Sequence, residues 1–229
     1  MLDTVLPNEP APGQSSEAQA RRRLGRRAIF KGIGLAALAM LLAECLRIFV
    51  GSNLHEVVPG KCYRSAQPTA PLLESVQRTY HIRSIVNLRD ENEDESWYQE
   101  EKESARRLGL SLINAGLSSK EQAPDEDFRK FVQAMKDAPE PILIHCANGN
   151  DRTGLASAVY LMMRTDTPIR EARRQLSLRY GHIAWSKASC LGRVLDSYES
   201  WLLSAGLTHH ADQFYFWGMN IYRQETIVN

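Results

Sequence analysis

The sequence lacks the features that mark several classes of protein. Its four cysteines, Cys45, Cys62, Cys146 and Cys190, contain no C-x-x-C pair and follow neither a disulfide framework nor a zinc pattern. No cluster of histidines or acids predicts a metal centre, and no internal repeat is visible. A net charge of +1 gives no overall attraction for nucleic acid. With 43% hydrophobic and 24% charged residues, the composition predicts a globular protein of one ordinary domain with appendages.

The long apolar stretch lies near the N-terminus. Residues 1–20 are polar and are predicted to be a disordered tail, and residues 21–27 are basic. Residues 28–50 are mostly apolar, and a helix over 29–50 would be about 33 Å long, enough to cross a hydrocarbon core of about 30 Å. We expect a single-pass membrane anchor with a cytoplasmic N-terminus, which puts the rest of the chain on the far side, the periplasm in a bacterium. Two alternatives stay open: an export signal similar to the twin-arginine type, or a helix of the folded domain.

Strand and helix patterns alternate beyond a short linker, for which we take residues 51–58. Apolar runs predict strands at residues 82–88, 110–114 and 142–144, while residues 57–60 and 62–68 predict a turn, a short strand and a loop. Helical periods predict helices at residues 71–80, 97–108, 123–138, 155–164, 169–180 and 191–205, the last ending before Gly206. The alternation predicts an α/β fold, with a small central, mostly parallel sheet flanked by helices, over residues 59–206. Residues 207–229 form a C-terminal tail to which the sequence assigns no role.

The stretch from Ile142 to Gly154 carries the chemistry. A short apolar strand ends at His145-Cys146, five residues follow, then come Arg152 and Thr153, and a helical pattern begins. Loop N–H groups and a helix N-terminus favour negative charge, so a cysteine in this place lies in an anion site and is favoured as the thiolate. Arg152 offers a planar fork that can bind two phosphate oxygens. Gly149 supplies the backbone freedom that such a curled loop needs.

This pattern resembles the loop of the cysteine-dependent protein tyrosine phosphatase superfamily, His-Cys-x-x-Gly-x-x-Arg-[Ser/Thr]. Tyr63-Arg-Ser-Ala-Gln-Pro68 is similar to the start of the small dual-specificity domains of that superfamily. The resemblance implies a nucleophilic Cys146, a phosphocysteine intermediate hydrolysed by water, and no metal or other cofactor. It also implies that His145 supports the loop and that Thr153 assists departure of the thiolate. The phosphate-binding residues would be Ala147, Asn148, Gly149, Asn150, Asp151 and Arg152.

The general acid is harder to assign from the sequence. Related domains carry an aspartate on a separate loop before the cysteine, but the matching place here holds Ser119. Some bacterial members carry an aspartate directly before the arginine, which makes Asp151 our first candidate. Asp125 is the second, although each carboxylate has a structural alternative: Asp151 as a brace of the loop, and Asp125 as an acid at a helix start.

The resemblance also bears on the substrate. Relatives that prefer phosphoinositides place lysines in this loop where the chain has Ala147 and Asn150. We therefore expect a phosphorylated protein, chiefly phosphotyrosine with dual specificity allowed, or a small phosphoester. The domain is also similar to atypical fungal and plant enzymes, some of which act on inositol pyrophosphates, so an inositol phosphate or pyrophosphate phosphatase is the alternative. A catalytically poor phosphate-binding module, or a thiol redox or sulfur-transfer protein with Cys62 or Cys190 as a resolving cysteine, stays open as well.

Overall fold

The computed structural model describes residues 29–40, 42–43, 46, 51–118, 120–183 and 190–224. The chain divides into two compact units, Met1–Leu46 and Arg47–Asn229, which we describe separately. The predicted tail at residues 1–20 and the basic residues 21–27 lie outside the described ranges, as does Ser119.

The first unit is described only in its helical part, residues 29–40, 42–43 and 46. None of the helices in the described ranges combines the length and the apolar character that crossing a membrane requires. The membrane anchor expected over residues 28–50 stays a prediction.

The second unit is built on a five-stranded sheet in the order β1-β2-β5-β3-β4. The strands are β1 (His55–Val58), β2 (Cys62–Ser65), β3 (Ser84–Asn87), β4 (Ser111–Asn114) and β5 (Ile142–His145). Strand β5 is central and pairs in parallel with both β2 and β3, while β1 runs antiparallel to β2. His145 is level with Ser65 on one side and with Asn87 on the other. The carboxyl ends of three parallel strands therefore meet directly before Cys146.

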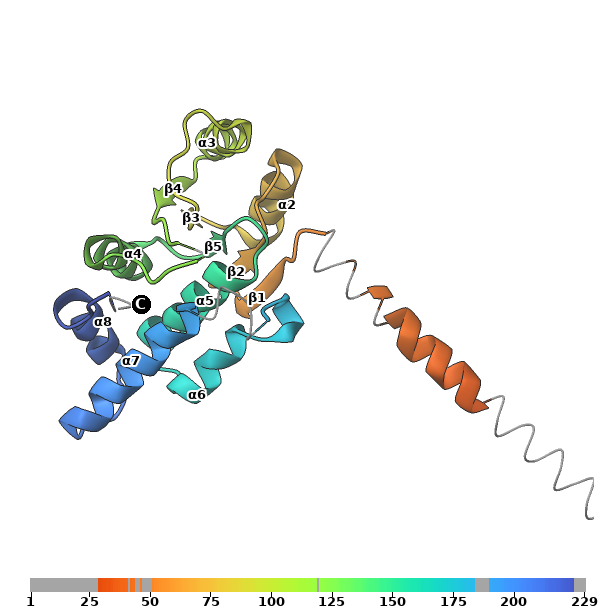
Figure 1. The fold of residues 1–229 in the computed structure, drawn as a ribbon. Helices are drawn as coiled ribbons and strands as arrows, with labels where there is room; N and C mark the ends of the chain where they lie inside the picture. The colour runs from red at the N-terminus through yellow and green to blue at the C-terminus, as the bar shows by residue number, and fades with distance from the viewer. Residues whose placement is uncertain are drawn as a thin grey trace, which may run out of the picture. The chain divides into compact units, whose positions relative to one another are not determined.

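Helices cover both faces of the sheet, which gives an α/β fold in three layers (Figure 1). The helices are α2 (Ala70–Tyr80), α3 (Ser96–Leu108), α4 (Asp125–Asp137), α5 (Asp151–Thr165), α6 (Ile169–Ala172), α7 (Cys190–Ala205) and α8 (Ala211–Asn220). Helices α2 and α3 pack on one face with Ile85 and Leu143. The neighbouring residues Val86 and Ile144 face the other helices. This alternation is the period of two that a strand buried on both faces imposes. The expected α/β class and mostly parallel sheet are confirmed.

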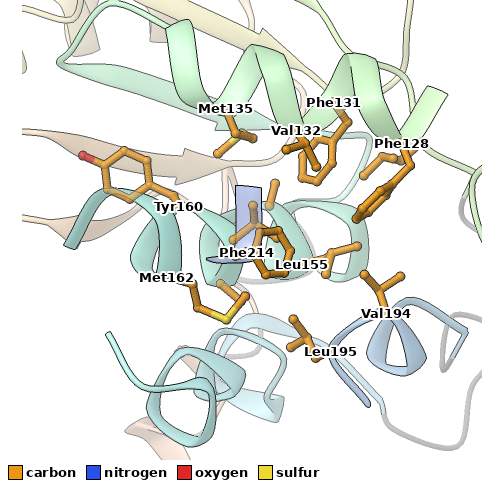
Figure 2. Packing of buried hydrophobic residues seen from close by; sticks show 14 of the residues in the cluster. Phe128, Phe131, Val132, Met135, Leu155, Tyr160, Met162, Val194, Leu195 and Phe214 are labelled. Carbon is orange, nitrogen blue, oxygen red and sulfur yellow. The ribbon is translucent and has the colours of Figure 1, made fainter. Parts of the chain in front are cut away.

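The larger core lies between the sheet and the helices that follow it. Figure 2 shows this packing, in which side chains from four helices meet around α5. They are Phe128, Phe131, Val132 and Met135 of α4, Leu155, Tyr160 and Met162 of α5, Val194 and Leu195 of α7, and Phe214 of α8. Burial of this many apolar side chains, at roughly 1.5–3 kcal/mol each, fixes α5 and with it the loop at its N-terminus.

Two expectations about the elements are wrong. Residues 51–58 are not a linker, because β1 pairs with β2 and Asn53 is fully buried. Residues 169–180 do not form one helix: α6 is followed by two 3₁₀ turns, Arg173–Gln175 and Leu178–Tyr180. The carbonyl of Gln175 accepts a hydrogen bond from Arg64 Nη1 (2.9 Å) instead of from an N–H one helical turn later. A tertiary contact therefore overrides the helical period there.

The C-terminal tail is part of the folded unit up to residue 224. Helix α8 packs against α4 and α5, and the ring of Tyr222 stacks on Phe128 with centroids 3.8 Å apart. The Tyr222 hydroxyl donates to the carbonyl oxygen of Ala123 (2.8 Å), just before α4. These contacts tie the end of the chain to the loop between β4 and α4.

Candidate active site

Cys146 is the first residue after the central strand, and only 4% of it is exposed. Helix α5 begins at Asp151, four residues before the Leu155 expected from the apolar period, so Arg152 and Thr153 lie in its first turn. The loop from Cys146 to Asn150 thus curls between the end of a buried strand and the N-terminus of a helix. In parallel α/β sheets ligands bind at the carboxyl ends of the strands, which is where this loop lies.

The carbonyl groups from Ala147 to Asn150 all have partners outside the loop. The backbone N–H of Gln67 donates to the carbonyl of Ala147 (3.1 Å), and Asn53 Nδ2 donates to that of Asn148 (3.1 Å). Arg64 Nη2 donates to the carbonyls of Gly149 (2.8 Å) and Asn150 (3.2 Å). In a planar trans peptide the N–H points opposite to the carbonyl, so the amides of residues 148–151 face the loop interior. None of these amides donates to another described residue. The loop is therefore a preformed cradle of N–H donors.

Arg64, on β2, is the main support of this cradle. Its side chain is completely buried and donates through Nη1 to the carbonyl and to the Oε1 of Gln175, and through Nη2 to two loop carbonyls. The guanidinium also lies over the ring of Tyr180, 4.0 Å from its centroid. Burial lowers the pKa of Arg64 to about 10, and the nearby Tyr180 opposes that shift. The group therefore stays protonated at neutral pH, and its positive charge orients the loop from behind.

Gly149 allows the loop to lie against the end of β2. Its φ of +72° is in the left-handed region, which costs a residue with a side chain about 1–2 kcal/mol. A Cβ at this position would be 2.7 Å from Ala66 N and 2.8 Å from Ser65 O. Both the dihedral angle and the close backbone approach therefore require glycine, as the motif predicts.

Arg152 is held by backbone oxygens and leaves donors free. Its Nη1 donates to the carbonyls of Leu88 (3.2 Å) and Leu117 (3.4 Å). Its Nε and Nη2 have no partner in the described part of the chain, so this guanidinium can donate two hydrogen bonds to the oxygens of an anionic ligand. Leu117 belongs to the loop between β4 and α4, so this loop contacts the arginine through its backbone.

His145 and Thr153 lie next to the loop and are fully buried. His145 Nε2 lies 2.6 Å from Glu101 Oε1, and neither side chain is exposed. Glu101 Oε2 accepts a hydrogen bond from Gln67 Nε2 (3.1 Å). The backbone N–H of Gln67 in turn donates to the carbonyl of Ala147 in the phosphate loop. Thr153 Oγ1 has no partner among the described residues. The supporting place expected for His145 fits this geometry, and the role of Thr153 stays a prediction.

Asp151, our first candidate for the general acid, is paired with a histidine. Its Oδ1 lies 2.6 Å from Nδ1 of His182, and its side chain is 29% exposed. The carboxylate is therefore held in position by His182 and is still accessible to solvent. His182 follows the second 3₁₀ turn, whose Tyr180 carbonyl accepts from Asn53 (3.1 Å). The contact joins the loop to a segment more than thirty positions away. The catalytic role of Asp151 stays a prediction.

Asp125 begins α4 and contacts the end of the chain. Its Oδ1 accepts from the backbone N–H of Gln224 (2.8 Å), and its Oδ2 lies 3.6 Å from Arg223 Nε and 3.7 Å from Arg129 Nη2. No hydrogen bond or ion pair in the described ranges joins it to the phosphate loop. These contacts of Asp125 fit the alternative of an acid at a helix start, and its catalytic role stays a prediction.

Cys62 lies too far from Cys146 to act as a resolving thiol. It is level with Ile142 at the start of the strands, and Cys146 is four positions further along. At about 3.3 Å per residue the two are roughly 13 Å apart, whereas disulfide Cα atoms lie within about 7 Å. Burial raises the pKa of the Cys62 thiol well above its ordinary value, which makes it inert. The redox alternative loses this partner, and the side chain of Cys190 lies outside the described residues.

The loop therefore combines a buried cysteine at its start, backbone amides that face its interior, and an arginine in the first turn of the helix that follows. The chain belongs to the tyrosine phosphatase family: the sequence profile of that family matches residues 50–165, about half of the chain. This match begins before β1 and ends with α5, so it covers the sheet and the complete loop.

Solved structures share the fold at low identity. Tk-PTP in its active form is 17% identical over 65% of this chain and 97% of that chain, with a TM-score of 0.51. A Cys-to-Ser variant of TpbA from P. aeruginosa, in complex with phosphotyrosine, is 18% identical over 73% and 91%, with a TM-score of 0.52. The core catalytic domain of the PP-IP phosphatase SIW14 from S. cerevisiae is 22% identical over 67% and 92%, with a TM-score of 0.47. The two structures with TM-scores above 0.5 show that the fold is shared, and no more.

Proposed function

We propose that this protein hydrolyses phosphate monoesters, chiefly phosphotyrosine in proteins, through a phosphocysteine intermediate. The observation that supports the proposal is the preformed cradle of N–H donors. Hydrogen bonds from outside the loop hold the carbonyls of residues 147–150, so the amides of residues 148–151 face the interior of the loop. Such donors stabilise the charge on the three equatorial oxygens of a transferring phosphoryl group at no cost in reorganisation.

The chemistry needs two displacements at phosphorus. The Cys146 thiolate attacks in line, a sulfur–phosphorus bond forms, and the ester oxygen leaves with a proton from an acid. A water oxygen then attacks the phosphocysteine, the sulfur–phosphorus bond breaks, and inorganic phosphate is released. Arg152 would bind the oxygens through its Nε and Nη2 in both steps, and we expect the Thr153 hydroxyl to assist the leaving thiolate in the second.

Two observations support phosphotyrosine over an inositol polyphosphate. The side chain of Asn150, where lysine-rich relatives carry a cation, is turned to Asn53, whose Nδ2 donates to its Oδ1 (3.0 Å). Ala147, at the other such position, has no charge.

Turnover of p-nitrophenyl phosphate by the purified full chain, with EDTA present, tests the activity. We expect metal-independent release of p-nitrophenol that Cys146→Ser abolishes, and binding of inorganic phosphate that the serine variant retains. Turnover that survives Cys146→Ser, or that EDTA removes, would refute the proposed mechanism.

Each of the two predicted acids already has a partner in the structure, which favours a second candidate function. In that candidate the protein binds phosphate but hydrolyses phosphate esters poorly. Asp151 is braced by His182, and Asp125 is bound to the C-terminal segment.

A general acid contributes about 10²–10⁴-fold when the leaving group is poor, and little when it is p-nitrophenolate. If Asp151 is the acid, Asp151→Asn should slow hydrolysis of a phosphotyrosine peptide by about 100-fold and leave p-nitrophenyl phosphate nearly unaffected. If neither Asp151→Asn nor the matched Asp125→Asn slows the peptide reaction, both assignments are wrong.

We further propose that residues 28–50 attach the protein to a membrane, with the N-terminus in the cytoplasm and the phosphatase unit on the far side. The support is the basic stretch at residues 21–27 and the exposed apolar side chains of residues 29–40, Ile33 and Leu38 among them. A reporter fused after Asn229 that is active in the cytoplasm would refute this topology. A mature protein shortened at its N-terminus would show an export signal in place of an anchor.

A further inference from the structure

Arg89 lies one residue beyond the carbonyl that holds Arg152. Leu88 donates its N–H to the carbonyl of His145 (3.0 Å) and accepts from Arg152 Nη1 through its own carbonyl (3.2 Å). Because β3 and β5 run in parallel with Asn87 level with His145, the chain beyond β3 passes directly beside the start of the phosphate loop. Arg89 is therefore a second guanidinium at the rim of the site, on a different element from Arg152.

The Arg89 side chain is held in place from two sides. Its Nη1 donates to Oε1 of Gln67 (2.9 Å), and its guanidinium carbon lies over the ring of Trp97, 3.4 Å from the centroid. Gln67 is itself fixed, because its Nε2 donates to Glu101 (3.1 Å). A side chain restrained in this way loses little conformational entropy when a ligand binds to it.

The charge of Arg89 is not neutralised inside the described part of the chain. No carboxylate there lies within ion-pair distance of it, and its Nε and Nη2 donate to no other described residue. Two acids of the following loop have other partners: Glu91 accepts a hydrogen bond from Asn114, and Glu93 forms an ion pair with Lys102. Burial, and then repulsion by Arg152, lower the pKa of Arg89, yet an arginine remains protonated at neutral pH. Arg89 and Arg152 therefore repel each other while neither has a carboxylate at ion-pair distance in the described ranges, and an anionic ligand would relieve that repulsion.

We propose that Arg89 is a specificity-determining residue that binds a Glu or Asp carboxylate next to the phosphotyrosine of the substrate. The loop amides and Arg152 account for the oxygens of the transferring phosphate, which leaves the Arg89 fork for a second oxyanion. One carboxylate matches one additional guanidinium, whereas a polyphosphate would need the lysines that this loop lacks. The inference rests on the proposed phosphotyrosine phosphatase function.

The test compares paired phosphotyrosine peptides that differ only in Glu or Gln directly before, or directly after, the phosphotyrosine. The full-length wild type, Arg89→Gln, Arg89→Lys and Arg83→Gln are assayed for kcat and KM at low and at high salt. Arg83 is the matched control, since it is exposed at the opposite end of the same strand. We expect the wild type to prefer Glu in one pair by about 10-fold in kcat/KM, mainly through KM, which is the scale of one charge-assisted hydrogen bond.

Arg89→Gln should reduce this preference to about 1, Arg89→Lys should retain part of it, and Arg83→Gln should retain all of it. The preference should also shrink as salt rises. A wild type without preference in either pair overturns the inference with no variant involved, and so does an Arg89→Gln variant that keeps the preference. If Arg89→Gln proves to be destabilised, with a much lower melting temperature, the preference of the wild type and of Arg89→Lys for Glu over Gln decides whether the inference holds. Failure of the wild type to hydrolyse p-nitrophenyl phosphate would instead refute the proposed function.

Discussion

Replacing Gly149 by alanine tests the idea that the phosphate loop depends on close backbone approach. The added Cβ would meet Ala66 N and Ser65 C at 2.7 Å, whereas ordinary carbon contacts lie near 3.5 Å or beyond. The loop or the end of β2 must therefore move by about 0.8 Å. The end of β2 is anchored, because Ala66 N donates to the carbonyl of Ser52 (2.7 Å), so most of the movement falls on the loop.

The expected cost has two parts. A left-handed φ costs alanine about 1–2 kcal/mol, and overpacking costs about 1–3 kcal/mol more. For a domain of this size each kcal/mol lowers the melting temperature by about 2–4 °C, so Gly149→Ala should lower it by roughly 4–20 °C. A displacement near 1 Å in a catalytic loop costs about 100-fold in rate, and we expect that loss in kcat/KM for p-nitrophenyl phosphate.

Gly60 provides the matched control. Its φ of +71° is almost the same as that of Gly149, but a Cβ there meets no atom within 4 Å. Gly60→Ala should therefore show only the dihedral cost, about 1–2 kcal/mol, with full activity. If the two alanine variants have the same melting temperature and the same kcat/KM, close approach at Gly149 does not shape the site, and the reasoning is wrong.

Three further results should follow. Arg64→Lys keeps the charge but not the fork, so we expect a loss of about 3 kcal/mol in urea unfolding together with weaker phosphate binding; binding as tight as in the wild type would contradict the supporting role. Tyr222→Phe keeps its ring stacking but leaves a buried carbonyl without its donor, which should cost about 1 kcal/mol, or 2–4 °C in a thermal melt; an unchanged melt would show that the C-terminal segment is not docked there. Burial lowers the pKa of His209 below its ordinary 6.5, so the unfolded chain binds the proton more readily than the folded chain does. The free energy of unfolding should therefore fall as the pH drops below 6.5, by at most about 1.4 kcal/mol per pH unit. His209→Gln should lessen this loss in unfolding curves at pH 7.5 and 5.5, and an equal pH dependence in both proteins would contradict it.

The sequence predicts the parts of the site that are local in the chain. Cys146, Gly149 and Arg152 lie within seven positions, and each belongs to a strand, a turn or a helix start with its own signal. The same holds for most of the elements, because the periods of two and 3.6 report which faces are buried. The helix expected over residues 169–180 fails where Gln175 contacts Arg64, a residue 111 positions away, for which the sequence around Gln175 gives no sign.

The supports of the loop could not be predicted in the same way. Arg64, Asn53 and His182 act on the loop across 85, 95 and 31 positions, and each looks locally like an ordinary polar residue. The sequence around Arg64 resembles that of the family, but nothing in it shows that a buried guanidinium would donate to two loop carbonyls. Only the sheet order, which places β2 beside β5, brings these residues together.

These supports also change the extent of the domain. A unit of residues 59–206 would lose Asn53, which donates to the carbonyls of Asn148 and Tyr180 and thereby joins the phosphate loop to the second 3₁₀ turn. It would also lose α8 and Tyr222, which cover α4 and hold the loop that contacts Arg152 through Leu117. Buried carbonyls without donors cost about 1–3 kcal/mol each, a large part of the stability of an ordinary domain. The unit that keeps the cradle in shape therefore runs from residue 51 to residue 224, and both of its ends serve the loop that the motif marks.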